Sequence, residues 1–301
     1  MNVINNIITK TIPFLPKKLV KIIADKYVAG QTPKEALSII KNLNSKKYEV
    51  TIDLLGEHLN NINETDNVTK TYIDILEQIN EQSLSSNISV KPTHIGLDVG
   101  IEEFYKNALI LVKKAETLNN FVRFDMEHSG TTEQTIDVFK KIYKTYKNTG
   151  IVFQAYLKRT YDDIDSMKEK INFRLCKGIY NESSNIAYND KQKINENYLR
   201  IAELAFKKEH YIGLATHDLG LTEQLYSLIN KYNVPNSNFE FQVLYGVPMH
   251  GWLQKHLNNN YKVRIYLPYG PQWYEYSIRR LKENPNIARY VAKSIFSNRS
   301  Y

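Results

Sequence analysis

The chain alternates between short β-rich runs and longer stretches in which apolar residues recur at helical spacing. Neighbouring runs begin roughly 30 residues apart or somewhat more, which is the length that a βαβ unit needs. Eight such units, spread over about 250 residues, predict an α/β fold, a (β/α)8 TIM-type barrel, over residues 47–301. The predicted strands are Tyr48–Leu55, Ile88–Leu97, Phe121–Met126, Gly150–Leu157, Asn172–Lys177, Tyr211–Thr216, Asn238–Leu244 and Lys262–Leu267.

Residues 1–46 lack β character and form a separate predicted unit, an N-terminal helical arm. Leu19, Ile22 and Ile23 have helical spacing, and Gly30 to Pro33 predict a turn that begins a second helix. A doubly wound open sheet is the alternative for the rest of the chain. No Gly-x-Gly-x-x-Gly motif opens a helix after any predicted strand, so the barrel is favoured.

Composition narrows the class of protein. With 301 residues and 42% hydrophobic content the chain can bury a large core, and no run of 18 apolar residues predicts a membrane span. The N-terminus does not have the pattern of a signal peptide. The single cysteine, Cys176, excludes an internal disulfide and indicates a reducing compartment, so we expect a cytoplasmic protein.

The net charge of +8 could indicate a nucleic-acid or anionic-membrane partner. The lysines are scattered as pairs along the chain, and no block of five like charges appears. We therefore expect a diffuse solvated surface and no nucleic-acid partner, while peripheral contact with a membrane stays open.

Charged residues occur inside or at the ends of otherwise apolar runs, where they need partners or a ligand. Lys91, Asp125 and Arg174 are the clearest cases, because an unpaired charge in such a position is costly. Structural ion pairs would explain each one singly. Together with the C-terminal basic residues they predict an electropositive pocket for a ligand with carboxylate or phosphate groups, formed by Lys91, Arg174, Lys177, Arg279 and Arg280.

The segment from Tyr266 to Asn284 predicts a strand, a Pro/Gly turn and a helix. In that helix Tyr276, Arg279 and Arg280 share one face with Glu283. Two adjacent guanidiniums beside an aromatic ring can hold a small carboxylate through bidentate hydrogen bonds. The alternative is a solvated helix face whose Arg–Glu pairs contribute little.

Two other chemistries use the same strand ends. A metal-dependent TIM-barrel hydrolase would need ligands, but no His-x-His or His-Glu-x-x-His spacing is present, so no metal is expected. Lys91 or Lys177 could also act as a Schiff-base lysine. The candidate metal ligands are His58, His94, His128, His217, Asp53, Asp125 and Asp218.

Five motifs in this order resemble the proline dehydrogenase family over residues 48–290: Asp53-x-x-Gly-Glu57, Arg174-Leu-x-Lys-Gly-x-Tyr180, Ala215-Thr-His217, Glu240-Phe-Gln-x-Leu244-x-Gly246 and Tyr276-x-x-Arg279-Arg280-Leu-x-Glu283-Asn284. The resemblance implies a barrel that binds FAD non-covalently and oxidises L-proline to Δ1-pyrroline-5-carboxylate, with hydride transfer from proline C5 to flavin N5, as the first step of proline catabolism. It also implies a monofunctional enzyme, a quinone electron acceptor and a separate pyrroline-5-carboxylate dehydrogenase that takes the product.

The same resemblance implies a role for individual residues. Lys91, Arg279 and Arg280 correspond to the residues that bind the proline carboxylate, and Glu57 to a gate over the substrate. Asp125 and Arg174 correspond to catalytic positions, Arg174 beside flavin N5. The substrate-pocket walls would be Tyr266, Tyr276, Leu244 and Tyr180, and Tyr266 would exclude 4-hydroxyproline. The other FAD contacts would be Met126, Gln154, Lys177, Gly178, Ile179, Thr216 and His217.

Overall fold

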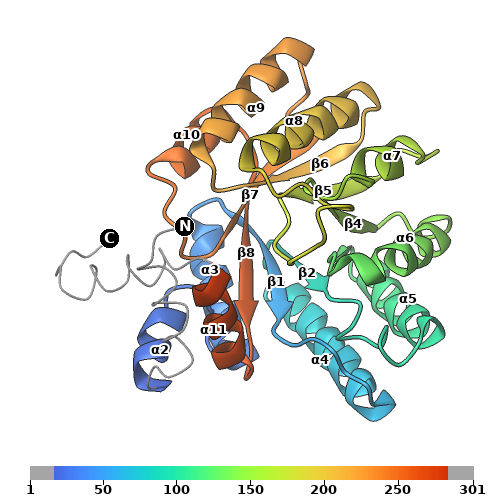
Figure 1. Ribbon diagram of the computed structural model, residues 1–301. Helices are drawn as coiled ribbons and strands as arrows, with labels where there is room; N and C mark the ends of the chain where they lie inside the picture. The colour runs from blue at the N-terminus through green and yellow to red at the C-terminus, as the bar shows by residue number, and fades with distance from the viewer. Residues whose placement is uncertain (1–16, 284–301) are drawn as a thin grey trace.

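Eight parallel strands close into a barrel in the computed structural model, which describes residues 17–283 without the side chains at positions 18, 19, 22, 23 and 279–283. Each strand pairs with the next along the chain, and β8 pairs with β1 (Figure 1). The predicted (β/α)8 fold is therefore confirmed. The strands are β1 Glu49–Leu54, β2 Ser86–Val90, β3 Val122–Phe124, β4 Thr149–Gln154, β5 Asn172–Cys176, β6 Tyr211–Ala215, β7 Phe239–Leu244 and β8 Val263–Tyr269.

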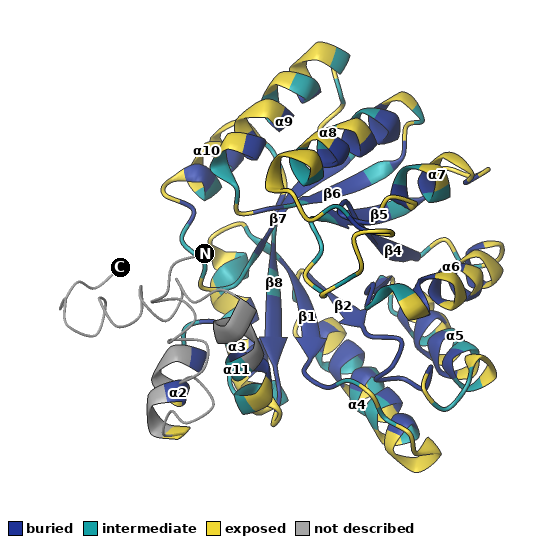
Figure 2. Ribbon diagram, viewed as in Figure 1, coloured by how far each residue is buried: buried dark blue, intermediate teal, exposed yellow. Residues whose placement is uncertain are grey.

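Helices surround the barrel and bury the face that they turn toward the strands (Figure 2). No helix within residues 17–283 is both long enough and apolar enough to cross a bilayer. The helices are α2 Lys17–Ala24, α3 Pro33–Ser45, α4 Ile62–Glu81, α5 Ile101–Thr117, α6 Ser129–Tyr143, α7 Thr160–Asp165, α8 Lys191–Lys207, α9 Leu219–Tyr232, α10 Trp252–Asn258 and α11 Trp273–Glu283.

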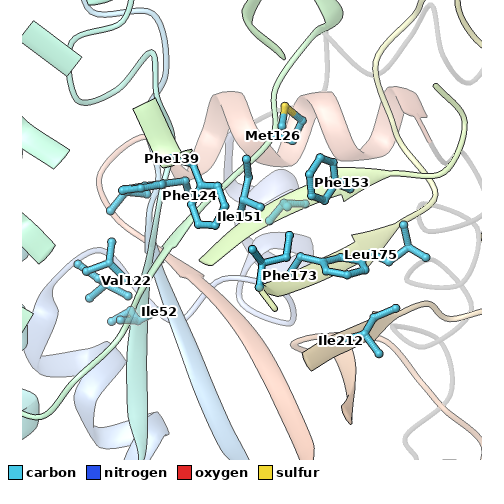
Figure 3. Packing of buried hydrophobic residues seen from close by; sticks show 14 of the residues in the cluster. Ile52, Val122, Phe124, Met126, Phe139, Ile151, Phe153, Phe173, Leu175 and Ile212 are labelled. Atoms are coloured by element: carbon cyan, nitrogen blue, oxygen red, sulfur yellow. The ribbon is translucent and has the colours of Figure 1, made fainter. Parts of the chain in front are cut away.

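Alternation along the strands decides which side chains meet the helices and which fill the barrel. The apolar side chains Ile151, Phe153 and Phe173 lie together in the core, and Phe139 of α6 belongs to the same cluster (Figure 3). Their neighbours in sequence, such as Val152 and Arg174, instead line the interior cavity. Because side chains alternate with a period of two, this apolar exterior forces every second residue of a strand into the barrel.

The interior toward the N-terminal ends of the strands is polar. Arg264 Nε donates to Glu240 Oε1 over 2.7 Å, and Arg264 Nη1 donates to Asn87 Oδ1 over 2.8 Å. Tyr211 OH donates to Glu240 Oε2 over 3.0 Å. A bulky branched core usually fills such a barrel, but here a network of paired charges and hydrogen bonds fills this part.

The N-terminal helices contact the last strand and the last helix. Helix α3 begins at Pro33, directly after the predicted turn at Gly30 to Pro33, and Thr32 and Glu35 form a capping box at its start. Helix α3 contacts β1 and β8, while α2 lies beside α11 (Figure 1). Ala29 N donates to Pro268 O over 2.8 Å, so the segment between α2 and α3 is fixed to β8. Residues 1–16 of the predicted arm lie outside the described chain, and the division at residue 46 stays a prediction.

Six predicted strands were too long at their C-terminal ends, the second and the fourth by three residues or more. The second ends at Val90 instead of Leu97, because the chain turns at Pro92 and Leu97 N donates to Pro92 O over 2.9 Å. The fourth ends at Gln154 instead of Leu157. The apolar residues that follow are buried in turns, where an apolar pattern is indistinguishable from that of a buried strand. Lys91 consequently lies just beyond a strand and not within one.

Candidate active site

A cavity of about 700 Å³ is formed at the C-terminal ends of the strands. This end of a barrel is where strand-end loops can converge on a ligand. Residues Arg279 and Arg280 belong to α11, but their side chains lie outside what the structure describes. All the other predicted site residues line the cavity: Glu57, Lys91, Asp125, Met126, Gln154, Arg174, Lys177, Gly178, Ile179, Tyr180, Thr216, His217, Leu244, Tyr266 and Tyr276.

Four charged side chains from four strand ends form a row on the cavity wall. Lys91 Nζ lies 2.6 Å from Asp53 Oδ2 and 3.9 Å from Asp125 Oδ2. Asp125 Oδ1 in turn accepts a hydrogen bond from Arg174 Nη2. All four residues are buried, so this row, Asp53–Lys91–Asp125–Arg174, alternates negative and positive charge in a medium where each charge requires its partner.

Asp125 is the most strongly held member of this row. Ser89 Oγ donates to Asp125 Oδ1 over 2.6 Å, and Tyr266 OH donates to Asp125 Oδ2 over 2.8 Å. Burial alone would raise the pKa of this carboxyl, but Arg174 and Lys91 hold it below its usual range. Asp125 is therefore ionised at neutral pH and fixed in orientation by three elements of the barrel.

The two cations of the row stay charged despite burial. Desolvation opposes the charge, yet Asp125 raises the pKa of Arg174, and Asp53 with Asp125 raises the pKa of Lys91. The Arg174 guanidinium lies 4.8 Å from the centre of the Tyr266 ring. Its Nη1 is buried and has no hydrogen-bond partner among the described residues. A buried donor of this kind beside a cavity is suited to a polar ligand atom.

A second cluster lies at the N-terminus of α9, beside the same cavity. Lys177 Nζ donates to Asp218 Oδ2 over 2.7 Å, while Asp218 Oδ1 caps α9 by accepting from Leu221 N over 3.2 Å. Partial burial opposes ionisation of Asp218, but these hydrogen bonds hold its pKa well below its usual range. His217 Nε2 accepts from Leu244 N over 2.9 Å and so joins β6 to β7.

The expectation of an electropositive pocket is wrong for the described side chains. Lys91, Arg174 and Lys177 each face an aspartate that balances their charge. Sequence reasoning identified the cations but not the pairs, since Asp53 and Asp218 are brought to them by strand pairing and by a helix N-terminus.

Glu127 also lines the cavity, although sequence reasoning gave it no role. Its two carboxylate oxygens accept from Thr93 N over 2.8 Å and from Thr93 Oγ1 over 2.6 Å. Thr93 Oγ1 accepts from His58 N over 3.1 Å, which connects Glu127 to the loop that carries Glu57. Burial raises the pKa of Glu127 to about 7. Its position two residues after Asp125 was the available sequence signal.

The proposed hydrolase ligands do not assemble as a metal site. Asp53 and Asp125 face cations, Asp218 caps a helix, and His58 Nδ1 lies 2.8 Å from Asp98 Oδ2. In the part of the chain that the structure describes, a group of potential ligand atoms within 4.8 Å of one another is formed by Glu57, His58 and Glu127. Both oxygens of Glu127 already accept hydrogen bonds from Thr93.

The chain is similar to known proteins over most of its length. A family model described as proline dehydrogenase matches residues 36–293. Proline dehydrogenase 2 of Bacillus subtilis (strain 168) is 35% identical over 91% of this chain and 91% of its own length. Proline dehydrogenase of Deinococcus radiodurans is 29% identical over 91% of this chain and 90% of its own. The crystal structure of proline utilization A from Bdellovibrio bacteriovorus superposes with a TM-score of 0.82 and 23% identity over 94% of this chain, which spans 35% of that protein.

Proposed function

Because the chain belongs to the proline dehydrogenase family, we propose that its cavity oxidises L-proline to Δ1-pyrroline-5-carboxylate with non-covalently bound FAD. The chain is a proline dehydrogenase, an oxidoreductase. The observation that carries the detailed proposal is the Asp53–Lys91–Asp125–Arg174 row on the cavity wall. It fixes two cations at separate points of the cavity, one for the substrate and one for the cofactor.

Lys91 holds the carboxylate of proline, together with Arg279 and Arg280 of α11. A charge-assisted hydrogen bond in a buried site is stronger than a neutral one, so Lys91 orients the ring as well as binding it. The side chain of Lys91 is 10% exposed, consistent with contact to a ligand inside the cavity. The pyrrolidine ring would lie among Tyr266, Tyr276, Leu244 and Tyr180, which all line the cavity.

The residues on the cavity wall fit FAD. Arg174 Nη1 and Gln154 Oε1 are a buried donor and a buried acceptor without partners in the described part of the chain, as a polar ring system would require. When bound in this cavity, FAD would supply the acceptor for the hydride that leaves proline C5. Arg174, held by Asp125, would be one of the residues that hold the cofactor, and its positive charge would favour the electron-rich reduced form. The further cofactor contacts would be Met126, Lys177, Gly178, Ile179, Thr216 and His217.

Non-covalent attachment is supported by the state of Cys176. This thiol lines the cavity, but burial raises its pKa to about 11. A protonated thiol is a poor nucleophile, so Cys176 is not suited to form a bond to the flavin.

The remaining parts of the proposal concern the cycle around the reaction. Glu57, which lines the cavity from the loop after β1, acts as the gate over the bound substrate. A quinone receives the electrons, and a separate pyrroline-5-carboxylate dehydrogenase takes the product. We further propose a cytoplasmic enzyme that contacts the membrane peripherally to reach that quinone.

An anaerobic titration tests the proposal. The purified protein is expected to be yellow, and L-proline should bleach its flavin absorbance while Δ1-pyrroline-5-carboxylate forms in equal amount. D-proline is the control, because D-proline with its carboxylate held at the same point presents the opposite face of its ring. A colourless protein, or a flavin that L-proline leaves unchanged, would overturn the proposed function.

A further inference from the structure

Asp53 occupies an unusual position on the cavity wall. Its side chain is 1% exposed, and its Oδ2 lies 2.6 Å from Lys91 Nζ. Its other oxygen, Oδ1, is buried and has no hydrogen-bond partner within the described residues. A buried carboxylate oxygen without a partner is costly, and the usual remedy is either a ligand or a proton.

The charges around Asp53 decide when Asp53 needs such a ligand or proton. Without substrate the row contains two cations, Lys91 and Arg174, and two carboxylates, Asp53 and Asp125, so it is neutral. A substrate carboxylate that binds Lys91 adds a third negative charge within reach of Asp53. The proposed function also assigns Arg279 and Arg280 of α11 to the substrate carboxylate, so the substrate has cations besides Lys91, whereas Asp53 must share its ammonium partner with it. Two carboxylates on one buried ammonium group repel each other, which raises the pKa of Asp53, the one with fewer other partners.

We propose that Asp53 positions Lys91 before substrate binds, and that it takes up one proton from solvent when a carboxylate ligand binds Lys91. This inference rests on the proposed function, which assigns the substrate carboxylate to Lys91. No bond of the substrate changes in the step: a solvent proton moves to Asp53, and Lys91 exchanges one carboxylate partner for another. Asp53 is thus a positioning residue whose charge competes with the ligand.

The neighbouring groups favour Asp53 as the proton acceptor over Asp125. Burial raises the pKa of Asp53 above its usual range even with Lys91 beside it, whereas the pKa of Asp125 is lowered. Asp125 keeps its hydrogen bonds from Arg174, Ser89 and Tyr266 when Lys91 is occupied. Within the described residues neither Arg174 nor Ser89 donates to Asp53, and Tyr266, which also lowers the pKa of Asp53, does not outweigh its burial. Within the described residues, the titratable or charged groups that face Asp53 are Lys91 just beyond β2, Asp125 just beyond β3, Arg174 from β5, Tyr266 and Tyr269 from β8 and Tyr72 from α4.

Glu127 is the other acid of the cavity that could take up a proton, since its pKa is about 7. It is separated from Asp53 experimentally by the substitution Glu127→Gln. A surface lysine–aspartate pair supplies the matched control for Asp53: Asp66 Oδ1 lies 3.2 Å from Lys106 Nζ between α4 and α5, and both side chains are partly exposed.

The experiment measures binding of cyclopentanecarboxylate, a proline analogue without an amine, to the FAD-loaded enzyme. Calorimetry in two buffers of different ionisation enthalpy counts the protons taken up, and Kd is followed from about pH 6 to about pH 8.5. We expect Kd of the unmodified enzyme to rise with pH, by up to about tenfold per unit for one proton. Glu127→Gln and Asp66→Asn should keep this slope. Asp53→Asn should abolish it and bind at least about tenfold more tightly at the upper end of the range, because the competing charge is gone.

The outcomes separate this inference from the proposed function. If Kd of Asp53→Asn still rises with pH, the proposed role of Asp53 is overturned. The same follows if the unmodified enzyme takes up no proton when the analogue binds, and this measurement does not depend on any variant. Uptake that disappears only in Glu127→Gln assigns the proton to Glu127 and also overturns the inference. In each of these cases L-proline still bleaches the flavin, whereas a protein that L-proline fails to reduce removes the proposed function itself.

Discussion

Glu240 provides a quantitative test of the polar interior of the barrel. Its carboxylate is 1% exposed and accepts from Arg264 Nε over 2.7 Å, from Gln242 Nε2 over 2.6 Å and from Tyr211 OH over 3.0 Å. Replacing Glu240 with Gln leaves the guanidinium of Arg264 buried, with Glu49 as its one counter-charge among the described residues. Removal of one partner of a buried ion pair costs about 3–5 kcal/mol, and the remaining partners place Glu240→Gln near 3 kcal/mol on that scale.

The pH dependence gives a second route to the same magnitude. Burial opposes ionisation of Glu240, but Arg264 holds its pKa at about 2, against an ordinary value of 4.5. At 1.36 kcal/mol per unit this difference corresponds to roughly 3 kcal/mol. Since the folded pKa is lowered, this stability is present above about pH 4.5 and is lost as pH falls toward 2.

Urea denaturation followed by circular dichroism measures the effect as a free energy of unfolding at neutral pH. Glu169→Gln is the control, because Glu169 pairs with Lys147 at the surface, where both side chains are 52% exposed. That substitution should cost less than about 1 kcal/mol. If Glu240→Gln costs no more than this control, the buried network does not stabilise the fold and the reasoning fails.

Three further variants test the cavity. The folded state raises the pKa of Glu127 from 4.5 to about 7, so the unmodified protein should lose stability as pH rises from about 4.5 through about 7. Glu127→Gln has no carboxyl at this position and should not show that loss. Free energies of unfolding from urea titrations that change equally with pH in both proteins would contradict this. Tyr266→Ser should lower the ratio of kcat/KM for L-proline to kcat/KM for 4-hydroxyproline by roughly tenfold, because a pocket wall that contacts an added hydroxyl group disfavours the larger substrate by about that factor. An unchanged ratio would count against the assignment of Tyr266 to the substrate pocket. Neutralising Arg279 and Arg280 together, as Arg279→Met with Arg280→Met, should raise KM for L-proline by about 100-fold or more through loss of charge-assisted hydrogen bonds, and intact turnover at low proline would remove them from the site.

The barrel was predictable from the sequence because its strands are marked by apolar runs of regular spacing. The ends of those runs were less well marked, as at Pro92, where buried turn residues continue the apolar pattern of β2. It was also predictable that the candidate residues of these motifs line one cavity, since the strand ends of a barrel meet at one edge. What the sequence could not provide was the pairing between them. Asp53 meets Lys91 only because β1 and β2 pair with Asp53 beside Ser89, a register that no local pattern encodes.

The position of the N-terminal helices was a second feature beyond the reach of local patterns. Helical spacing indicated that residues 17–45 form helices, and the capping box at Thr32 is a local signal. Their contacts with β8 and α11 join segments more than 200 residues apart in sequence, through bonds such as Ala29 N to Pro268 O. Tertiary packing determines such contacts, and the local pattern of a single sequence does not show them.

Anaerobic reduction of the flavin by L-proline in the unmodified enzyme and in Lys91→Met tests the central claim most directly. Lys106→Met, in the surface pair with Asp66, is the matched control. If Lys91 holds the substrate carboxylate, Lys91→Met should need about 10–150 times more L-proline for half-maximal reduction, because loss of one hydrogen bond to a charged group weakens binding by about that factor. Lys106→Met should behave as the unmodified enzyme. Equal proline dependence in all three proteins would contradict the account.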